Sequence, residues 1–394
     1  MSAQRRVIIA GGGIAGASLA YVLAQRQGVD VTLLEREAQC GAHATGRSAA
    51  LYMPSYGPPG IRALTIGSGA FYAQPPSGFS EHAVLSPRGA MHVAWSGDDP
   101  PVSIADATQK LDALERDALA SGVEVERLSA AQCLQLCPVL RSKGASHVLV
   151  GGVYEPHAQD MDVDAILQGF LRGARKAGAN VVTGTEIRTP ERADDAWKIS
   201  TSAGVWHADV LVNAAGAWAD ALGQRAGAQP IGLQPRRRSA FTFDAPEGVD
   251  CRAWPLVIGV DESFYFKPSG SGLLGSPANA DAVQPQDVQP EELDIAQGIW
   301  AIEQATTLTI RRPRSTWAGL RSFVADGEPV CGYDPDVPGL FWLAGQGGYG
   351  IQSAPGLARA AAALLLDEPL PGDLQSQGLR RAMLDPLRLR NTKT

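Results

Sequence analysis

The fold is decided by residues 7–16, VIIAGGGIAG. The first four residues are apolar and typical of a buried strand, the glycines form a turn, and residues 17–25 continue in a helical pattern. Gly11 permits the tight turn, Gly13 lets the backbone approach a pyrophosphate, and Gly16 lets the helix pack closely on the strand. The unpaired N–H groups at the helix start favour phosphate groups. The stretch therefore predicts a dinucleotide-binding site.

An acidic residue follows at the spacing that this motif requires. A second apolar strand, residues 31–34, ends at Glu35, nineteen residues after Gly16. A carboxylate in that position can accept hydrogen bonds from both hydroxyls of a ribose. A glycine-rich turn that binds nothing is the alternative interpretation, and it leaves Glu35 unexplained. The motif by itself does not separate NAD from FAD, because both present an adenosine pyrophosphate to the same loop.

Two further segments favour a flavin. Residues 43–50, HATGRSAA, are small or hydrogen-bonding and suit a chain that passes close to a planar ring. Near the other end, an apolar strand at residues 341–344 runs into a second glycine-rich turn, residues 345–352, and then into an alanine-rich helix. The backbone N–H groups of this turn and the helix start can meet the partly negative N1/C2 end of a flavin. A plain strand-to-helix loop is the alternative.

Size and charge limit the class of protein. The chain has 394 residues, 45% of them hydrophobic, which is enough for two intertwined domains. A net charge of −7 and a pI near 5.5 argue against binding of nucleic acid. The five cysteines are odd in number and scattered, which fits a reducing compartment. Cys133 and Cys137 have no second cluster to complete a zinc site, so we expect buried helix residues and no metal.

The N-terminus has some features of a targeting leader. Arg5 and Arg6 precede an apolar run that ends at Leu23, as in a secretory or twin-arginine signal. The glycine spacing within that run favours strand, turn and helix instead. No later segment has the roughly 18 uninterrupted apolar residues of a membrane helix. We therefore expect a soluble, cytoplasmic protein without stable membrane insertion, and peripheral contact with the inner membrane face stays open.

The motifs together point to a known family. The sequence resembles the D-amino-acid oxidase superfamily of FAD-dependent oxidoreductases at residues 11–16, 35–36, 45–48, 212–218 and 347–350. Within it, the sequence resembles the bacterial D-arginine dehydrogenases at residues 233–235, 237–241, 261–265, 275–281 and 316–323. This resemblance extends over nearly the whole chain.

The resemblance implies an α/β fold with two domains. A Rossmann-like FAD-binding domain with a doubly wound sheet is assembled from residues 1–56, 145–232 and 330–394. An α+β substrate-binding domain, with a mixed sheet that covers the flavin, takes residues 57–144 and 233–329. The patterning agrees, because the first and last stretches alternate apolar runs with glycine turns and helical runs. Helices are also expected at residues 104–120 and 291–305.

The resemblance also implies which residues hold the cofactor. FAD is expected to be bound noncovalently, because none of the cysteines lies where the superfamily attaches its flavin. The expected cofactor-binding residues are Gly11, Gly13, Ala15, Gly16, Glu35, Arg36, Ala44, Thr45, Gly46, Arg47, Ser48, Ala49, Gly216, Gly347, Gly348, Tyr349, Gly350, Ile351 and Gln352.

A small carboxylate-bearing amine needs a fixed cation to hold it. A planar guanidinium that makes two parallel hydrogen bonds is the best choice. The resemblance assigns this role to Arg321, with Arg238, Tyr56 and Tyr265 beside it. The run Arg236–Arg238 could instead be a solvated basic face, because only one of three neighbours on a strand is expected to point inward. Ordinary packing is the alternative for the two tyrosines.

The side-chain pocket departs from the arginine-specific relatives. Ala90 stands where they carry a glutamate, Leu51 where they have a histidine and Met53 where they have a threonine, while Gly348 also borders the pocket. A buried guanidinium without an acid partner costs several kcal/mol of desolvation. We therefore expect a preference for apolar or aromatic side chains. A neighbouring acid such as Glu81 could replace the missing one.

These features predict an FAD-dependent D-amino acid dehydrogenase. Hydride transfer from the substrate Cα to flavin N5 gives an imino acid, which hydrolyses to a 2-oxo acid and ammonia. The expected partners are a small D-amino acid and an unidentified quinone- or dye-like electron acceptor. Oxygen is not expected to be an efficient acceptor, because no cation stands near Leu274, where related oxidases carry a lysine that activates oxygen. Secondary amines of the sarcosine or proline type and 2-hydroxy acids are alternatives. Another alternative is a flavin- or NAD-binding module that acts on tRNA or serves as a redox sensor. The net negative charge of the chain argues against it.

Overall fold

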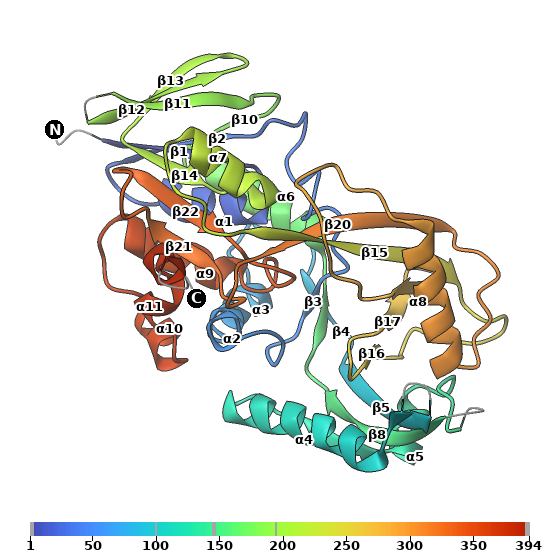
Figure 1. The fold of residues 1–394 in the computed structure, drawn as a ribbon. Coiled ribbons are helices and arrows are strands. Elements are labelled where there is room, and N and C mark those ends of the chain that lie inside the picture. The colour runs from blue at the N-terminus through green and yellow to red at the C-terminus, as the bar shows by residue number, and fades with distance from the viewer. Residues whose placement is uncertain (1–3, 99–100, 144–146, 194, 391–394) are drawn as a thin grey trace.

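The computed structural model describes residues 4–98, 101–143, 147–193 and 195–390, which form a mixed α/β fold with two large sheets (Figure 1). The first sheet has the order β10-β2-β1-β14-β22-β21. Its strands are β1 (Arg5–Ala10), β2 (Val29–Leu34), β10 (Asn180–Val182), β14 (Val210–Asn213), β21 (Val330–Tyr333) and β22 (Leu340–Ala344). All neighbours are parallel except β21 and β22. The α/β fold class expected from the sequence is confirmed.

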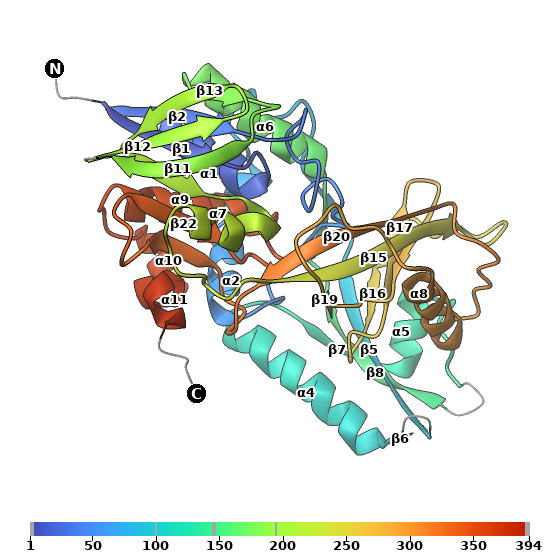
Figure 2. The same cartoon turned by 45° about the horizontal axis from the view of Figure 1, so that its top comes forward.

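Both faces of this sheet are covered, which explains its unbroken apolar strands. Val7 and Ile9 of β1 pack toward helices α1 (Ile14–Ala24) and α9 (Ala354–Leu365). Ile8 packs on the other face toward Trp197 of a small antiparallel sheet and Leu222 of α7 (Ala219–Arg225). That small sheet consists of β11 (Ile187–Ala193), β12 (Ala196–Thr201) and β13 (Gly204–Ala208). Figure 2 shows it lying over β1 and β2.

The second large sheet has the order β19-β15-β18-β17-β16-β5-β8-β7, with β20 and β6 paired to β15 and β5. Its strands are β5 (Ala90–Asp98), β6 (Pro101–Val102), β7 (Glu126–Ser129), β8 (His147–Glu155), β15 (Gln234–Asp244), β16 (Leu256–Gly259), β17 (Tyr265–Ser269), β18 (Gly272–Ser276), β19 (Asp281–Ala282) and β20 (Ser315–Phe323). Helices α4 (Ile104–Ala120), α5 (Ala130–Leu136) and α8 (Glu292–Ala305) pack on it. Figure 1 shows the long pair β15 and β20 of this sheet extending at one end toward the first sheet.

A third, small sheet and several further helices complete the fold. A small sheet is formed by β3 (Leu51–Tyr52), β9 (Gln159–Met161) and β4 (Leu85–Pro87). The remaining helices of the described residues are α2 (Pro59–Ile66), α3 (Gly69–Ala73), α6 (Val163–Lys176), α10 (Gly372–Ser376), α11 (Arg381–Leu384) and the 3₁₀ turns η1 (Gly216–Trp218) and η2 (Pro386–Leu389). The first sheet takes β1, β2, β10, β14, β21 and β22 and the second takes β5–β8 and β15–β20, so the chain crosses between them four times.

Several features expected from the sequence can be compared directly with the structure. The helices expected at residues 104–120 and 291–305 are present as α4 and α8, and Cys133 and Cys137 are buried. Arg5 and Arg6 begin strand β1. Within the described residues, the helices are too short or too polar to cross a membrane. The first sheet draws its strands from the three stretches expected for the FAD-binding domain, but the domain limits stay a prediction, and the one at residues 144–145 lies outside the described residues.

A buried ion pair joins β15 to α8. Arg237 is 8% exposed, and its Nε donates to Oδ2 of Asp294 at 2.8 Å, while Glu291 also binds the guanidinium. Asp294 is itself 5% exposed and accepts a second hydrogen bond from Ser239 Oγ at 2.7 Å. Removing one partner of such a pair leaves a buried charge with incomplete compensation.

We predict that Asp294→Ala lowers the free energy of unfolding by about 3 kcal/mol, because Arg237 stays buried without its main partner. Denaturant unfolding followed by circular dichroism measures this. The control Asp250→Ala removes the partner of the exposed Arg252 and should leave the unfolding midpoint unchanged. Equal midpoints for Asp294→Ala and the parent would contradict the prediction.

Candidate active site

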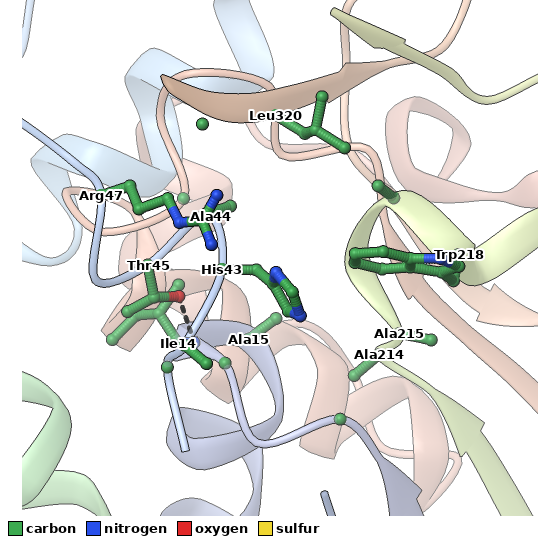
Figure 3. A pocket seen from close by; sticks show the side chains of 18 of the residues that line it. Ile14, Ala15, His43, Ala44, Thr45, Arg47, Ala214, Ala215, Trp218 and Leu320 are labelled. Carbon is green, nitrogen blue, oxygen red and sulfur yellow. Dashed lines mark hydrogen bonds between the residues drawn. The ribbon is translucent and has the colours of Figure 1, made fainter. Parts of the chain in front are cut away.

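A deep cavity opens at the carboxyl ends of β1, β2, β14 and β22 (Figure 3). It continues to the inner face of β15 and β20 and has a volume of about 290 Å³. Its lining extends from Glu35 at the end of β2 to Arg238 of β15. Open α/β sheets bind their ligands outside the carboxyl ends of the strands. The lining is therefore suited to an extended ligand that reaches from the first sheet to the second.

Glycines let the first turn of α1 approach β1. Gly11 has φ +112°, and a Cβ there would lie 2.4 Å from the carbonyl oxygen of Ala214. A Cβ on Gly16 would lie 2.0 Å from the carbonyl oxygen of Gly11. Gly13, the N-cap of α1, lines the cavity and has an extended backbone with φ −74°. Two of the three glycines thus serve close packing, and Gly13 leaves the cavity wall bare.

Backbone and side-chain hydrogen bonds hold the wall of the cavity in place. Glu35 is 8% exposed, and its Oε2 accepts from Gly12 N at 2.6 Å while its Oε1 accepts from Glu37 N at 2.9 Å. Thr45 Oγ1 accepts from Ile14 N at 3.0 Å, which ties the loop at residues 41–49 to the helix start (Figure 3). Each Glu35 oxygen keeps a further lone pair for a hydroxyl group.

Aromatic and cationic side chains line the same part of the cavity. The Arg36 guanidinium lies 3.8 Å from the centre of the Trp218 ring. The His43 ring lies 4.8 Å from the same ring, and Figure 3 shows the two facing each other. Hydrogen bonding to His43 and then to Arg36 lowers the pKa of Glu37, although burial opposes this. The guanidinium of Arg47 is hydrogen-bonded within the protein. It donates to Asp287 at 2.5 Å and to the carbonyl oxygens of Val288 and Ala318.

These residues fit a dinucleotide. Gln346 also lines the cavity, and its Nε2 is buried without a hydrogen-bond partner within the described residues. A buried amide donor of this kind needs an acceptor that the protein does not supply. Together with the bare backbone at Gly13 and the carboxylate of Glu35, it makes a cradle suited to phosphate, ribose and ring acceptor groups.

Most of the expected cofactor residues line the cavity. They are Gly11, Gly13, Ala15, Glu35, Arg36, Ala44, Thr45, Arg47, Ser48, Ala49, Gly216, Gly347, Gly348, Gly350 and Ile351. Gly16, Gly46, Tyr349 and Gln352 do not line it. Gln352 accepts from Met53 N at 3.1 Å and donates to the carbonyl oxygen of Tyr56 at 3.3 Å, so it fixes the loop at residues 53–56. The sequence analysis missed Gln346, Trp218 and His43 as individual wall residues.

The side chains of two arginines line the part of the cavity next to β15 and β20, where we expect the substrate. Arg321 of β20 and Arg238 of β15 both line it, with Tyr265 beside them. A Cβ on Gly348 would lie 2.8 Å from Arg321 Nη1, so the guanidinium touches the bare backbone of that turn. Within the part of the chain that the structure describes, Arg321 has no hydrogen bond or ion pair. Burial, followed by the charge of Arg321, lowers the pKa of Arg238.

The arrangement favours an anion. Arg238 Nε donates to the carbonyl oxygen of Asn279 at 2.5 Å, which holds it beside Arg321 without neutralising it. Two like charges in a desolvated site are best compensated by a carboxylate or a similar anion. Tyr56 packs edge-on against Tyr349 at 4.9 Å, and burial raises the pKa of Tyr56, while the nearby charges of Arg321 and Arg238 lower it by less.

One of the three arginines Arg236–Arg238 points into the site, as expected, because Arg238 lines the cavity. Arg237 is buried against α8 on the other face of β15, so the alternative of a solvated basic face is wrong for these two residues. Arg236 is exposed and stacks 5.5 Å from the centre of the Phe323 ring. Both faces of β15 are covered, so alternation along the strand buries two neighbouring charges in different surroundings.

The departures at residues 51, 53 and 90 meet in one apolar cluster. Met53 and Ala90 are buried in it, and Leu51, Tyr56 and Tyr265 pack against them. Ala158, Leu256 and Ile258, which the sequence analysis did not name, complete the cluster.

Two charged neighbours were not expected from the sequence. Glu81 lies on the surface, whereas Glu155 stands directly opposite Ala90 in the pairing of β5 and β8. Lys267 is 8% exposed and pairs with Leu274 across β17 and β18, so a cation does lie at this place, contrary to the expectation. Its Nζ donates to Asp160 Oδ1 at 2.6 Å, which neutralises it.

Fold and cavity together define a protein that binds a dinucleotide at the edge of a parallel sheet. A family model described as FAD dependent oxidoreductase, DAO, matches residues 6–364. The chain belongs to this family of FAD-dependent oxidoreductases, and FAD is its cofactor.

Individual relatives agree with this assignment. Human mitochondrial sarcosine dehydrogenase is 26% identical over 316 residues, which are 75% of this chain and 34% of that protein, so the chain spans about a third of its length. The uncharacterised oxidoreductase YurR of Bacillus subtilis is 25% identical over 391 residues, which cover 94% of this chain and 97% of that protein. The crystal structure of glycine oxidase from Geobacillus kaustophilus superposes with a TM-score of 0.79 at 21% identity, covering 96% and 99% of the two chains.

We predict that the purified protein is yellow, releases FAD on acid treatment, and loses it when Gly13 is replaced by valine. The valine side chain would occupy the cavity wall where the backbone meets the pyrophosphate. Flavin absorbance per protein after gel filtration measures retention. The matched control is Gly372→Val, which meets no atom within 4 Å and should keep its flavin. Full flavin content in Gly13→Val, or flavin that stays with the denatured chain, would contradict the prediction.

Proposed function

We propose that this protein is an FAD-dependent dehydrogenase of D-amino acids. The observation that carries the proposal is the pair of guanidinium groups, Arg238 and Arg321, which line the cofactor cavity together with Tyr265, a residue that also packs against the apolar cluster. An α-amino acid presents a carboxylate and an aliphatic side chain on one carbon. The carboxylate complements the two arginines, and the side chain complements the apolar cluster.

The residues of this chain would act mainly by positioning. Arg321 would bind the substrate carboxylate, with Arg238 and Tyr265 beside it, and the cluster around Met53 and Ala90 would take the side chain. Bound FAD supplies the electron acceptor for the substrate Cα hydrogen, and the resulting imino acid hydrolyses in water to a 2-oxo acid and ammonia. Oxidation of a neutral amine requires little acid or base assistance, so fixed charge and fixed orientation contribute most.

Different observations support the D configuration of the substrate and the kind of group that is oxidised. The resemblance to D-arginine dehydrogenases at segments such as residues 261–265 and 316–323 supports a D-amino acid. The similarity to human sarcosine dehydrogenase supports a secondary amine as the second candidate. The same arginine pair would also hold a 2-hydroxy acid. Anaerobic bleaching of the flavin by D- and L-amino acids, sarcosine, proline and 2-hydroxy acids separates these candidates.

We predict that Arg321→Met lowers kcat/KM for the best substrate at least tenfold, because each charge-assisted hydrogen bond to the carboxylate contributes roughly 1.5–3 kcal/mol. Flavin content should not change. Arg236→Met is the matched control, since Arg236 is exposed two residues before Arg238. Parent-like turnover in Arg321→Met would show that this guanidinium has only a structural role.

We also predict that the reduced protein reacts slowly with oxygen and needs an added quinone or dye as acceptor. Oxygen reduction develops negative charge that a free cation would stabilise, but the nearby Lys267 is already bound by Asp160 at 2.6 Å. Stopped-flow reoxidation in air measures the rate. Asp160→Asn, which frees the ammonium, should react faster than the parent, and rapid peroxide formation by the parent would contradict the prediction.

A further inference from the structure

The connection between β19 and α8 forms part of the wall of the cofactor cavity. We call residues 284–290 of this connection the strap. Gln286 and Val288 line the cavity, whereas Asp287 between them does not. The side chain of Asp287 is 63% exposed to solvent. At this place the wall between the cavity and the solvent is therefore only one chain segment thick.

Few backbone contacts hold the strap. Before it, Val283 N donates to the carbonyl oxygen of Pro235 at 3.0 Å. After it, Glu291 is bound by Arg237. Between these two points the strap makes no backbone-to-backbone hydrogen bond within the described part of the chain. Segments with few stabilising contacts open locally at a low cost in free energy, so the strap can open while its ends stay fixed to β15.

Two contacts hold the middle of the strap against the first sheet. Arg47 donates from Nη2 to Oδ1 of Asp287 at 2.5 Å and from Nη1 to the carbonyl oxygen of Val288 at 3.0 Å. The Val288 side chain is 4% exposed and packs with Ala217 and Leu320. Arg47 follows β2 and Ala217 follows β14, both strands of the first sheet, whereas the strap follows β19 of the second. The contacts therefore connect the two sheets at the cavity.

The strap lies next to the part of the cavity that fits the adenosine end of FAD. The cluster around Val288 includes Trp218, and the guanidinium of Arg36 lies 3.8 Å from the centre of the Trp218 ring. Arg36 follows Glu35, whose carboxylate fits the ribose hydroxyls. Figure 3 shows Arg47 and Trp218 on opposite sides of this part of the cavity. A cofactor bound there has the strap on its outer side.

The contact between Asp287 and Arg47 is an ion pair that solvent can reach. Hydrogen bonding to Arg47, and then its positive charge, lowers the pKa of Asp287. His43 Nδ1 lies 3.9 Å from the same carboxylate oxygen. Both side chains of the pair are partly exposed, so dissolved salt weakens their attraction.

We propose that the strap covers bound FAD and that the ion pair of Asp287 and Arg47 keeps it closed. The tricyclic ring of a flavin is rigid and cannot leave a covered cavity by bending, so release of FAD requires the strap to open. The strength of the pair then sets the rate of release. The strap is a cofactor-binding element contributed by the second sheet, and Asp287 is its positioning residue. This inference concerns the cofactor and goes beyond the proposed function.

The test measures how fast bound FAD exchanges with free FAD. The holoprotein is incubated with an excess of isotope-labelled FAD, and mass spectrometry of the acid-released flavin gives the rate. Asp287→Asn keeps the shape and removes the charge, so we expect exchange at least about threefold faster than in the parent, as for the loss of a partly exposed ion pair. Asp287→Glu keeps the charge and should exchange within about twofold of the parent rate.

Two further variants test whether the strap itself is responsible. Gln289→Ala is the matched control, because Gln289 is an exposed strap residue without a hydrogen bond among the described residues, and it should exchange at the parent rate. Val288→Ala should exchange faster than the parent, because it removes apolar contacts with η1 and β20. Raising NaCl from about 0.05 to 0.5 M should speed exchange in the parent more than in Asp287→Asn, since salt screens the pair.

Thermal unfolding separates opening of the strap from a general loss of stability. With excess FAD, Asp287→Asn should unfold at the parent temperature, because a partly exposed pair contributes little to global stability. A parent-like exchange rate in Asp287→Asn, or equal acceleration by Gln289→Ala, would overturn the inference. These measurements use no substrate, so failure of the proposed function would show separately, as absence of flavin bleaching by D-amino acids.

Discussion

Helix α1 meets strand β1 at Gly16 and Gly11, where a Cβ on Gly16 would stand 2.0 Å from the carbonyl oxygen of Gly11. This contact sets the position of the helix start relative to the carboxyl ends of the parallel strands. The distance from Thr45 to the Ile14 N–H and the place of Glu35 beside Gly12 both follow from it. A helix held farther away by one methyl group would withdraw its N–H groups from the cavity, and the cofactor site depends on those groups.

The opposite wall of the cavity depends on how β15 is covered. Arg237 and Arg238 are neighbours in sequence, yet Arg237 is neutralised by acids near α8 while Arg238 stands beside the unpaired Arg321. A strand places successive side chains on opposite faces, so the two cations meet different surroundings. One stabilises the packing of α8 on the sheet, and the other is left to compensate a bound anion.

An apolar cluster adjoins the cavity through Tyr265 and is bordered by buried charges from neighbouring strands. Glu155 stands opposite Ala90, and Lys267, bound by Asp160, stands opposite Leu274. Each of these charged residues has a polar partner inside the protein, Ser55 for Glu155 and Asp160 for Lys267, which reduces the cost of burying it beside apolar side chains.

The sequence by itself determined the parts whose contacts are local. The strand, glycine turn and helix at residues 5–24, the acid at Glu35 and the helices α4 and α8 follow from spacing and periodicity, because their interactions join residues close along the chain. Only the tertiary structure decided that Gln352 binds the loop at Met53, 299 positions away, that Ser55 meets Glu155, 100 positions away, and that Arg237 is buried away from the cavity. These contacts depend on strand register and on what covers each sheet face, and register is set by the packing of whole faces, which no local pattern of residues encodes.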